Sequence, residues 1–140
     1  MNIQRQNGFS LIELLIVVVV IGVIAAIAIP SLLGARTAAQ KADAIATLQT
    51  VRSLQAMFRS SNTRYARLAE INQLNANNLG VIAGPTLRRK GYVFQMFRTV
   101  PTDAELVSSY MIFATGYGHD GTVYQFMMEA DGVITQIAPL

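Results

Sequence analysis

The sequence Leu-Leu-Ile-Val-Val-Val-Val-Ile-Gly-Val-Ile-Ala-Ala-Ile-Ala-Ile, residues 14–29, is a run of sixteen apolar residues that decides the fold. Between Phe9 and Ile29 only Ser10 and Glu13 are polar. These 21 residues would span about 30 Å as an α-helix, which matches the hydrocarbon core of a bilayer. The run therefore predicts a membrane-spanning helix, and a carboxylate in such a helix usually marks a function because burying it is costly.

The composition of the chain is that of a folded protein without thiol chemistry. The chain has 140 residues, of which 52% are hydrophobic and 14% charged, and its length suggests one domain beyond the apolar run. It has no cysteine, which excludes disulfides, thiolate metal sites and thiol catalysis. The net charge of +3 is too small to indicate a nucleic-acid-binding protein.

Three interpretations of the amino-terminal segment compete. A cleaved secretory signal would use Arg5 as its charged start and residues 26–28 as its cleavage site. A carboxylate opens that apolar region, however, and Pro30 lies two residues past the proposed cut. A plain membrane anchor is permitted by length and hydrophobicity, but it leaves Glu13 and the junction of residues 8 and 9 without a role.

The third interpretation rests on the motif Gly-Phe-Ser-Leu-Ile-Glu-Leu-Leu at residues 8–15. A glycine, an aromatic residue, a hydroxyl residue, two aliphatic residues and a glutamate precede the long apolar run. This order closely resembles the processing motif of type IV prepilins and pseudopilins. The resemblance is strong from Met1 to about Phe58 and covers the rest of the chain only in architecture. It implies that a membrane-embedded prepilin peptidase cuts after Gly8 and methylates the new amino terminus at Phe9.

The resemblance also implies a role for Glu13 in filament assembly. In the mature chain Glu13 follows Phe9 by four residues, about one helical turn. A carboxylate packed among apolar subunits is costly unless it is paired. We therefore expect Glu13 to pair with the cationic amino terminus of a neighbouring subunit. The expected partners are then further copies of this chain in a homopolymeric filament, together with related minor subunits.

Two further features of the segment concern helix packing. Gly22 and Ala26 are four residues apart, a spacing of small residues that lets helices approach closely, although alanine is common in any helix. Pro30 removes a backbone donor from the helix, so we expect a kink there. Filament pilins resemble this chain in having a proline near this position.

The predicted fold class is α+β and resembles the pilin head. One long helix is expected over residues 9–59, because apolar residues recur every three or four positions along residues 38–58. Its second half is expected to pack on a roughly four-stranded antiparallel sheet. Asp131-Gly132 predicts a hairpin turn between the last two strands. The expected strands are residues 91–98, 109–115, 122–129 and 133–137.

The expected domain organisation follows from these elements. Residues 1–8 are the leader that is removed, residues 9–30 the transmembrane and filament-core helix, and residues 31–140 the head. The head comprises an amphipathic helix at 31–59, a mixed connector at 60–90 and the antiparallel sheet at 91–140. Within the connector, the spacing of Leu68, Ile71 and Leu74 indicates a short helical face.

The sequence predicts no catalytic residue, no cofactor and no metal site. His119 is the only histidine, and His119-Asp120 between two glycines is more typical of a hairpin turn than of a metal or catalytic site. Asp103 and Glu105 lie two residues apart in a polar segment and are interpreted as a solvated loop. A membrane-anchored hydrolase is the alternative of another class, and nothing in the head supports it.

Two filament functions remain open. The first is a structural subunit of a type IV pilus that serves adhesion, twitching motility or DNA uptake. The second is a pseudopilin of a type II secretion system. Major pseudopilins typically carry a calcium loop near the carboxyl terminus, whereas residues 131–136 are poor in oxygen ligands. This contrast favours the pilus.

The resemblance also implies partners and a location. The partners are the prepilin peptidase and N-methyltransferase, the inner-membrane assembly platform, and the lipid bilayer before assembly. The chain would cross the bacterial inner membrane once and then enter a cell-surface pilus, or a periplasmic pseudopilus under the second function. DNA is a further candidate partner only through Arg88-Arg89-Lys90, the densest basic run, because affinity for phosphates grows with the number of contacts.

Overall fold

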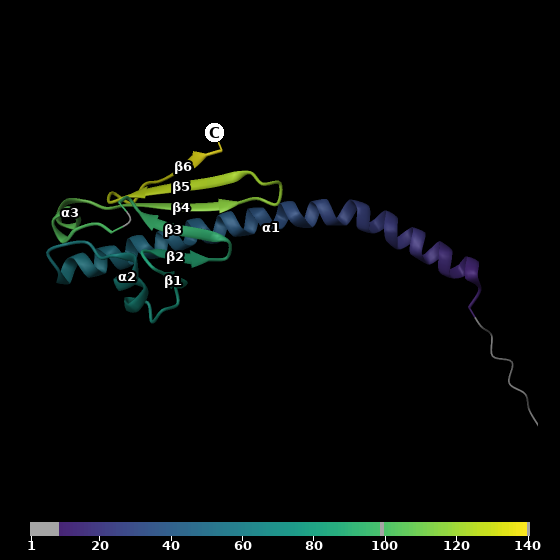
Figure 1. The fold of residues 1–140 in the computed structure, drawn as a ribbon, viewed down its shortest axis with the longest axis horizontal. Coiled ribbons are helices and arrows are strands. Elements are labelled where there is room, and N and C mark those ends of the chain that lie inside the picture. The colour runs from purple at the N-terminus through teal and green to yellow at the C-terminus, as the bar shows by residue number, and fades with distance from the viewer. Residues whose placement is uncertain (1–8, 99, 140) are drawn as a thin grey trace, which may run out of the picture. The chain divides into compact units, whose positions relative to one another are not determined.

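The computed structural model describes residues 9–98 and 100–139, so the leader, with Gly8, lies outside the described residues. The chain divides into two compact units, Met1–Ala35 and Arg36–Leu140. The first unit holds the amino-terminal part of helix α1, and the second holds the remainder of α1 and all the strands (Figure 1).

Helix α1, Leu11–Ser61, agrees closely with the long helix that the sequence predicts. Two polar side chains, which come after the last apolar residues of the helix, bind backbone carbonyl groups in its last turn. Ser60 donates a hydrogen bond to the carbonyl oxygen of Met57 at 2.7 Å, and Asn62 donates one to that of Phe58 at 2.9 Å. These bonds satisfy carbonyl groups that have no partner within the helix, so the helix ends where the turn-forming residues begin.

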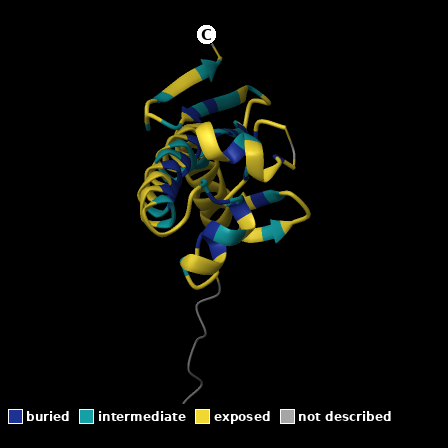
Figure 2. Cartoon of the chain, turned by 90° about the vertical axis from the view of Figure 1, so that its left-hand side faces the viewer, coloured by how far each residue is buried: buried dark blue, intermediate teal, exposed yellow. Residues whose placement is uncertain are grey.

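The part of α1 in the second unit buries one face. Ala44, Leu48, Val51 and Gln55 are buried and recur every three or four residues, as one face of a helix requires. Figure 2 shows buried residues on the side of α1 that faces the strands and exposed residues on its outer side.

Within the described residues, six antiparallel strands form one sheet in chain order, so each strand pairs with its neighbours in sequence. The predicted α+β class is confirmed, with six strands in place of about four. The two additional strands, β1 and β2, lie in the segment predicted as a connector. The strands are β1 Val81–Ala83, β2 Thr86–Arg89, β3 Tyr92–Met96, β4 Met111–Tyr117, β5 Val123–Glu129 and β6 Ile134–Ala138.

Turns hold this meander in register. The hairpin between β5 and β6 turns at Asp131-Gly132, as predicted, and Gly132 has a φ of +82°, which favours glycine. The Asp131 carboxylate accepts the backbone N–H of Val133 at 2.8 Å. Asp120 does the same for Thr122 at 3.0 Å in the turn between β4 and β5. Both aspartates therefore stabilise turns by binding the backbone two residues further on.

Two short helices flank the sheet. Helix α2, Leu68–Leu74, lies where the sequence indicates a short apolar helical face. Helix α3, Asp103–Ser108, occupies the segment that was interpreted as a solvated loop, and that interpretation was wrong. Its start is a capping box, because Thr102 accepts a hydrogen bond from the Glu105 N–H while the Glu105 carboxylate accepts one from the Thr102 N–H.

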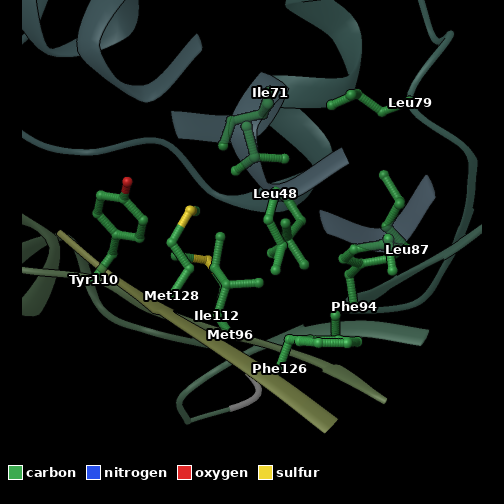
Figure 3. Packing of buried hydrophobic residues seen from close by; sticks show 14 of the residues in the cluster. Leu48, Ile71, Leu79, Leu87, Phe94, Met96, Tyr110, Ile112, Phe126 and Met128 are labelled. Atoms are coloured by element: carbon green, nitrogen blue, oxygen red, sulfur yellow. The ribbon is translucent and has the colours of Figure 1, made fainter. Parts of the chain in front are cut away.

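The core of the second unit lies between α1 and the inner face of the sheet. Figure 3 shows Leu48 of α1 and Ile71 of α2 close to side chains of β3, β4 and β5. Phe94, Ile112 and Met128 are among the residues that are almost completely buried there. Burying a side chain of this size contributes roughly 1.5–3 kcal/mol, so the sheet and α1 stabilise each other mainly through this cluster.

A buried amide joins α1 to the connector. The Gln55 side chain is 1% exposed. Its Nε2 donates to the carbonyl oxygen of Ala66, and its Oε1 accepts the Ala66 N–H, both at 2.8 Å. Because both halves of the amide are satisfied by the backbone of one residue, Gln55 fixes the place where the chain returns along the helix.

Ion pairs fix two other parts of the chain. Asp43 of α1 contacts Arg89 at 3.0 Å and Lys90 at 2.9 Å, beside the turn between β2 and β3. Burial opposes ionisation of the Asp43 carboxyl, but hydrogen bonds from Lys90 and Arg89 outweigh it and lower the pKa. Arg64 binds both carboxylate oxygens of Glu70, at 2.9 Å and 2.7 Å, and these hydrogen bonds lower the pKa of Glu70.

The lowered pKa values of Asp43 and Glu70 predict a loss of stability in acid. Carboxyl groups in the unfolded chain titrate near pH 4, and those with a lower pKa in the folded state stabilise it fully only above that value. We expect the melting temperature of the full-length chain in detergent, followed by near-ultraviolet circular dichroism, to be constant above about pH 5 and to fall below about pH 4. The variant Asp43→Asn with Glu70→Gln should show a smaller fall, and an unchanged pH profile would contradict this assignment.

A double-mutant cycle tests the contact between Asp43 and Arg89. Asp43→Asn alone should reduce the free energy of unfolding by about 1–2 kcal/mol, because two charge-assisted hydrogen bonds are weakened. Arg89→Gln alone should cost at least as much, because Arg89 also donates hydrogen bonds to the carbonyl oxygens of Asn78 and Leu79, at 2.9 Å and 3.1 Å. The two effects should not add, and strict additivity in denaturant unfolding of the full chain would show that the contact contributes no coupling energy.

Candidate assembly segment at the amino terminus

The first unit presents an apolar surface that nothing in the described chain covers. Every leucine, isoleucine and valine from Leu11 to Leu32 is exposed, with exposed fractions between 47% and 83%. Phe9 is 75% exposed. Of the described helices, α1 alone is long and apolar enough to cross a membrane, judged by length and composition. A helix that is apolar on all sides requires an apolar environment, such as lipid or other helices.

The start of α1 places a carboxylate at the end of this apolar surface. The carbonyl oxygen of Ser10 accepts the backbone N–H groups of Glu13 and Leu14, at 3.1 Å and 3.2 Å. Glu13 therefore lies in the first turn of the helix. A negative charge is favourable there because the helix dipole is positive at its amino terminus. The helix dipole therefore favours the negative charge of Glu13 at this position.

Gly22 occupies an open position on this helix. A Cβ atom added to Gly22 would have no neighbour within 4 Å, so nothing in the described chain requires glycine there. Glycine inside a helix is less stable than alanine by roughly 0.5–1 kcal/mol. This cost has no compensation within the described chain, and Ala26 continues the same small surface one turn later. Their predicted role in helix packing remains a prediction.

Pro30 lies inside α1, and the helix continues on both sides of it. Because proline has no N–H, it cannot donate to the carbonyl oxygen of Ala26, four residues earlier. One rung of the helical hydrogen-bond ladder is therefore missing at the end of the apolar run. The predicted kink at Pro30 remains a prediction.

The structure places the other candidate residues outside this segment. His119 lies in the turn between β4 and β5, where its Nδ1 is 3.2 Å from the hydroxyl oxygen of Thr37. Among the described residues, no group of three or more histidine, cysteine, aspartate or glutamate side chains is arranged to hold a metal ion. Asp103 contacts Arg64 and Arg67, at 3.2 Å and 2.6 Å, and thus contributes to packing at the start of α3.

The basic run at residues 88–90 is divided by its contacts. Arg89 and Lys90 bind Asp43, whereas Arg88 is exposed. Only Arg88 is then fully available to a phosphate, which weakens the DNA interpretation. The sequence gives no sign that Asp43 is the partner, because Asp43 and Arg89 are 46 positions apart along the chain. Asp43 and Arg89 meet because the turn between β2 and β3 lies beside α1 in the folded chain.

Comparison with known families identifies the segment. Residues 3–29 match the prokaryotic N-terminal methylation motif, found in type IV pilins and pseudopilins. This is a prepilin-type signal. A comparison with curated proteins gives no match to the chain. The prepilin-type signal confirms the resemblance that the sequence indicates, and the match includes both the cleavage junction and Glu13.

The prepilin-type signal supports a pilin-like or pseudopilin protein. It implies processing by a prepilin peptidase and assembly into pilus-type polymers. Together with the apolar helix it fits anchoring in the inner membrane before assembly. The proteins that share this signal are structural rather than enzymatic.

Proposed function

We propose that this chain is the structural subunit of a type IV pilus, held in the inner membrane by the first part of α1 until it polymerises. The observation that carries the proposal is the continuity between the prepilin-type signal and an uncovered apolar helix. An ordinary secretory signal is lost on cleavage. Cleavage after Gly8 would instead leave the whole apolar helix on the mature chain, with Phe9 as its new, methylated amino terminus.

The charge on Glu13 gives the polymer its register. When the helices of several subunits pack together, water is excluded and an unpaired carboxylate becomes costly. The cationic amino terminus at Phe9 of a neighbouring subunit removes that cost. Since apolar side chains pack in many registers, a single charge pair in a low-dielectric environment selects one of them. Gly22 and Ala26 provide the close approach between helices that this register requires.

A pseudopilin of a type II secretion system is the second candidate, because the prepilin-type signal is common to both classes. The hairpin between β5 and β6 favours the pilus. Its carboxylate, on Asp131, accepts the Val133 N–H and thereby stabilises the turn. A carboxylate used in this way is a turn residue rather than one member of a calcium loop.

Sheared filaments test the proposal. Cells that express the chain are sheared, the extracellular filaments are collected, and the amino terminus of the subunit is determined by mass spectrometry. The pilus proposal predicts a subunit that begins with N-methylated Phe9. A chain that is absent from sheared material, remains in the envelope and is required for secretion of exoproteins would overturn it in favour of the pseudopilin.

Glu13→Val and Glu13→Gln should abolish or severely reduce filaments while leaving membrane insertion and cleavage largely intact. Both substitutions remove the charge, and Gln keeps the size of the side chain. Glu13→Asp keeps the charge on a shorter side chain and should retain part of the assembly. The measurements are the mass of the membrane-bound chain and the yield of sheared filaments. Normal filament yield from Glu13→Gln cells would sink the charge-pair role.

Substitution at Gly22 should separate helix stability from helix packing. Gly22→Ala should stabilise the isolated helix by roughly 0.5–1 kcal/mol. Gly22→Leu should reduce filament yield much more than Gly22→Ala, because the larger side chain prevents close approach of helices. Val19→Leu, at an exposed apolar position, is the matched control and should leave the yield close to normal. Equal yields from both glycine variants and the control would contradict the packing role.

A further inference from the structure

The second unit begins at Arg36 of α1, and two turns of the sheet lie beside the first residues of the helix there. The turn between β2 and β3 reaches α1 through the ion pair of Lys90 with Asp43, at 2.9 Å. The turn between β4 and β5 reaches it where Nδ1 of His119 is 3.2 Å from the hydroxyl oxygen of Thr37. Figure 1 shows both turns at one end of the sheet. We call this end of the head the entry end, and it comprises residues 36–43, 88–91 and 117–122.

The entry end carries the whole net side-chain charge of the second unit. It has five basic and two acidic residues, a net charge of +3, and these are Arg36, Lys41, Arg88, Arg89 and Lys90 with Asp43 and Asp120. The rest of the unit has five basic and five acidic residues, which balance, and these are Arg52, Arg59, Arg64, Arg67 and Arg98 with Glu70, Asp103, Glu105, Glu129 and Asp131. The head is therefore positive at one end and neutral elsewhere.

Much of the positive charge at the entry end is open to solvent. Arg36 and Arg88 are exposed, and neither forms an ion pair with another described residue. Lys90 is paired with Asp43, but its side chain is 64% exposed. At the opposite end, three arginines pair with carboxylates of α2 and α3. The charge at the entry end is thus available to a partner outside the chain.

The entry end follows the apolar part of α1 closely along the chain. Arg36 comes four residues after Leu32, where the exposed apolar surface of α1 ends. Four residues reach at most about 14 Å even when they are fully extended. The headgroup layer on each side of the hydrocarbon core is about 5–7 Å thick. Once the first part of α1 is inserted in a bilayer, the chain keeps Arg36 near the headgroups.

An exposed tyrosine adds an independent feature of a membrane-facing surface. Tyr117 is the last residue of β4 and is 67% exposed. Tyrosine is enriched at membrane–water interfaces, where its ring meets apolar groups while its hydroxyl stays in contact with water. Basic residues next to a membrane helix attract anionic lipid headgroups. The entry end combines both kinds of residue.

We propose that the entry end of the head docks on anionic phospholipid headgroups while the first part of α1 is anchored in the bilayer. The inference rests on the anchoring in the proposed function and extends it to the head. Arg36, Arg88 and Lys90 supply positive charge to the contact, and Tyr117 enters the headgroup layer. A lipid surface is the occupant because the chain itself brings it within reach and because its charge is opposite. The contact exists only in the membrane, so it stabilises the anchored subunit until the subunit is extracted.

Acetylation of amines measures the contact, because Lys41 and Lys90 are the only lysines of the chain and both lie at the entry end. The full-length chain is placed in nanodiscs that each hold one copy, made of phosphatidylcholine with or without phosphatidylglycerol. Mass spectrometry follows the acetylation of Lys90, which should be about fivefold slower in the anionic discs, the factor expected for one basic residue at such a surface. The difference should disappear in about 1 M salt, where charges are screened beyond about 3 Å.

Two variants test whether the entry end docks as a unit. Arg36→Gln and Arg88→Gln each remove an exposed charge that has no ion pair among the described residues, so both should remain folded by near-ultraviolet circular dichroism. Each should remove most of the protection of Lys90 in anionic discs. Arg52→Gln, at an exposed arginine of the opposite end, is the matched control and should keep the protection. A direct effect of the lipid charge on lysine reactivity would instead be the same in all variants.

The outcomes separate this inference from the proposed function. The chain should elute together with both kinds of disc, and failure to do so would overturn the anchoring and this inference together. Equal acetylation of Lys90 in both discs, or protection that Arg36→Gln and Arg88→Gln leave unchanged, would overturn the inference alone. Protection in phosphatidylcholine discs by millimolar glycerol phosphate would also overturn it, because the entry end would then bind a soluble phosphate rather than a lipid surface.

Discussion

The main physical constraint on this protein is the exposed apolar surface of the first part of α1. The leucine, isoleucine and valine side chains from Leu11 to Leu32 are exposed within the first unit. The favourable free energy of removing that surface from water must therefore come from lipid or from other copies of the helix. Within one chain, nothing in the described residues requires glycine at position 22, and Glu13 lies in the first turn of the same helix.

In the second unit, by contrast, the apolar face of α1 is covered by other residues of the same chain. Leu48 and Val51 achieve this against the inner face of the sheet. Without cysteine, the connection between helix and sheet relies on packing and polar contacts. The Gln55 amide and the Asp43 carboxylate supply two of these contacts, at separate points along the helix.

Local patterns in the sequence predicted most of the fold. The spacing of apolar residues predicted α1 and α2, and Asp131-Gly132 predicted the last hairpin. Strands β1 and β2 were missed because they have only three and four residues and β2 ends in two arginines. Helix α3 was missed although Thr102 and Glu105 have the spacing of a capping box. The prepilin-type signal was recognised as a local motif, whereas the partner of Arg89 is set by tertiary contacts.

The order of the strands has a consequence for how the head folds. Each strand pairs with the one made just before it, so the sheet grows at one edge as the chain is synthesised, and each step closes only a short loop. The apolar face of α1 is complete long before β5 supplies Phe126 and Met128. Until then that face is open to solvent and to other nascent chains. The interval between synthesis of the helix and synthesis of β5 is therefore the period in which the newly made subunit is most exposed to aggregation.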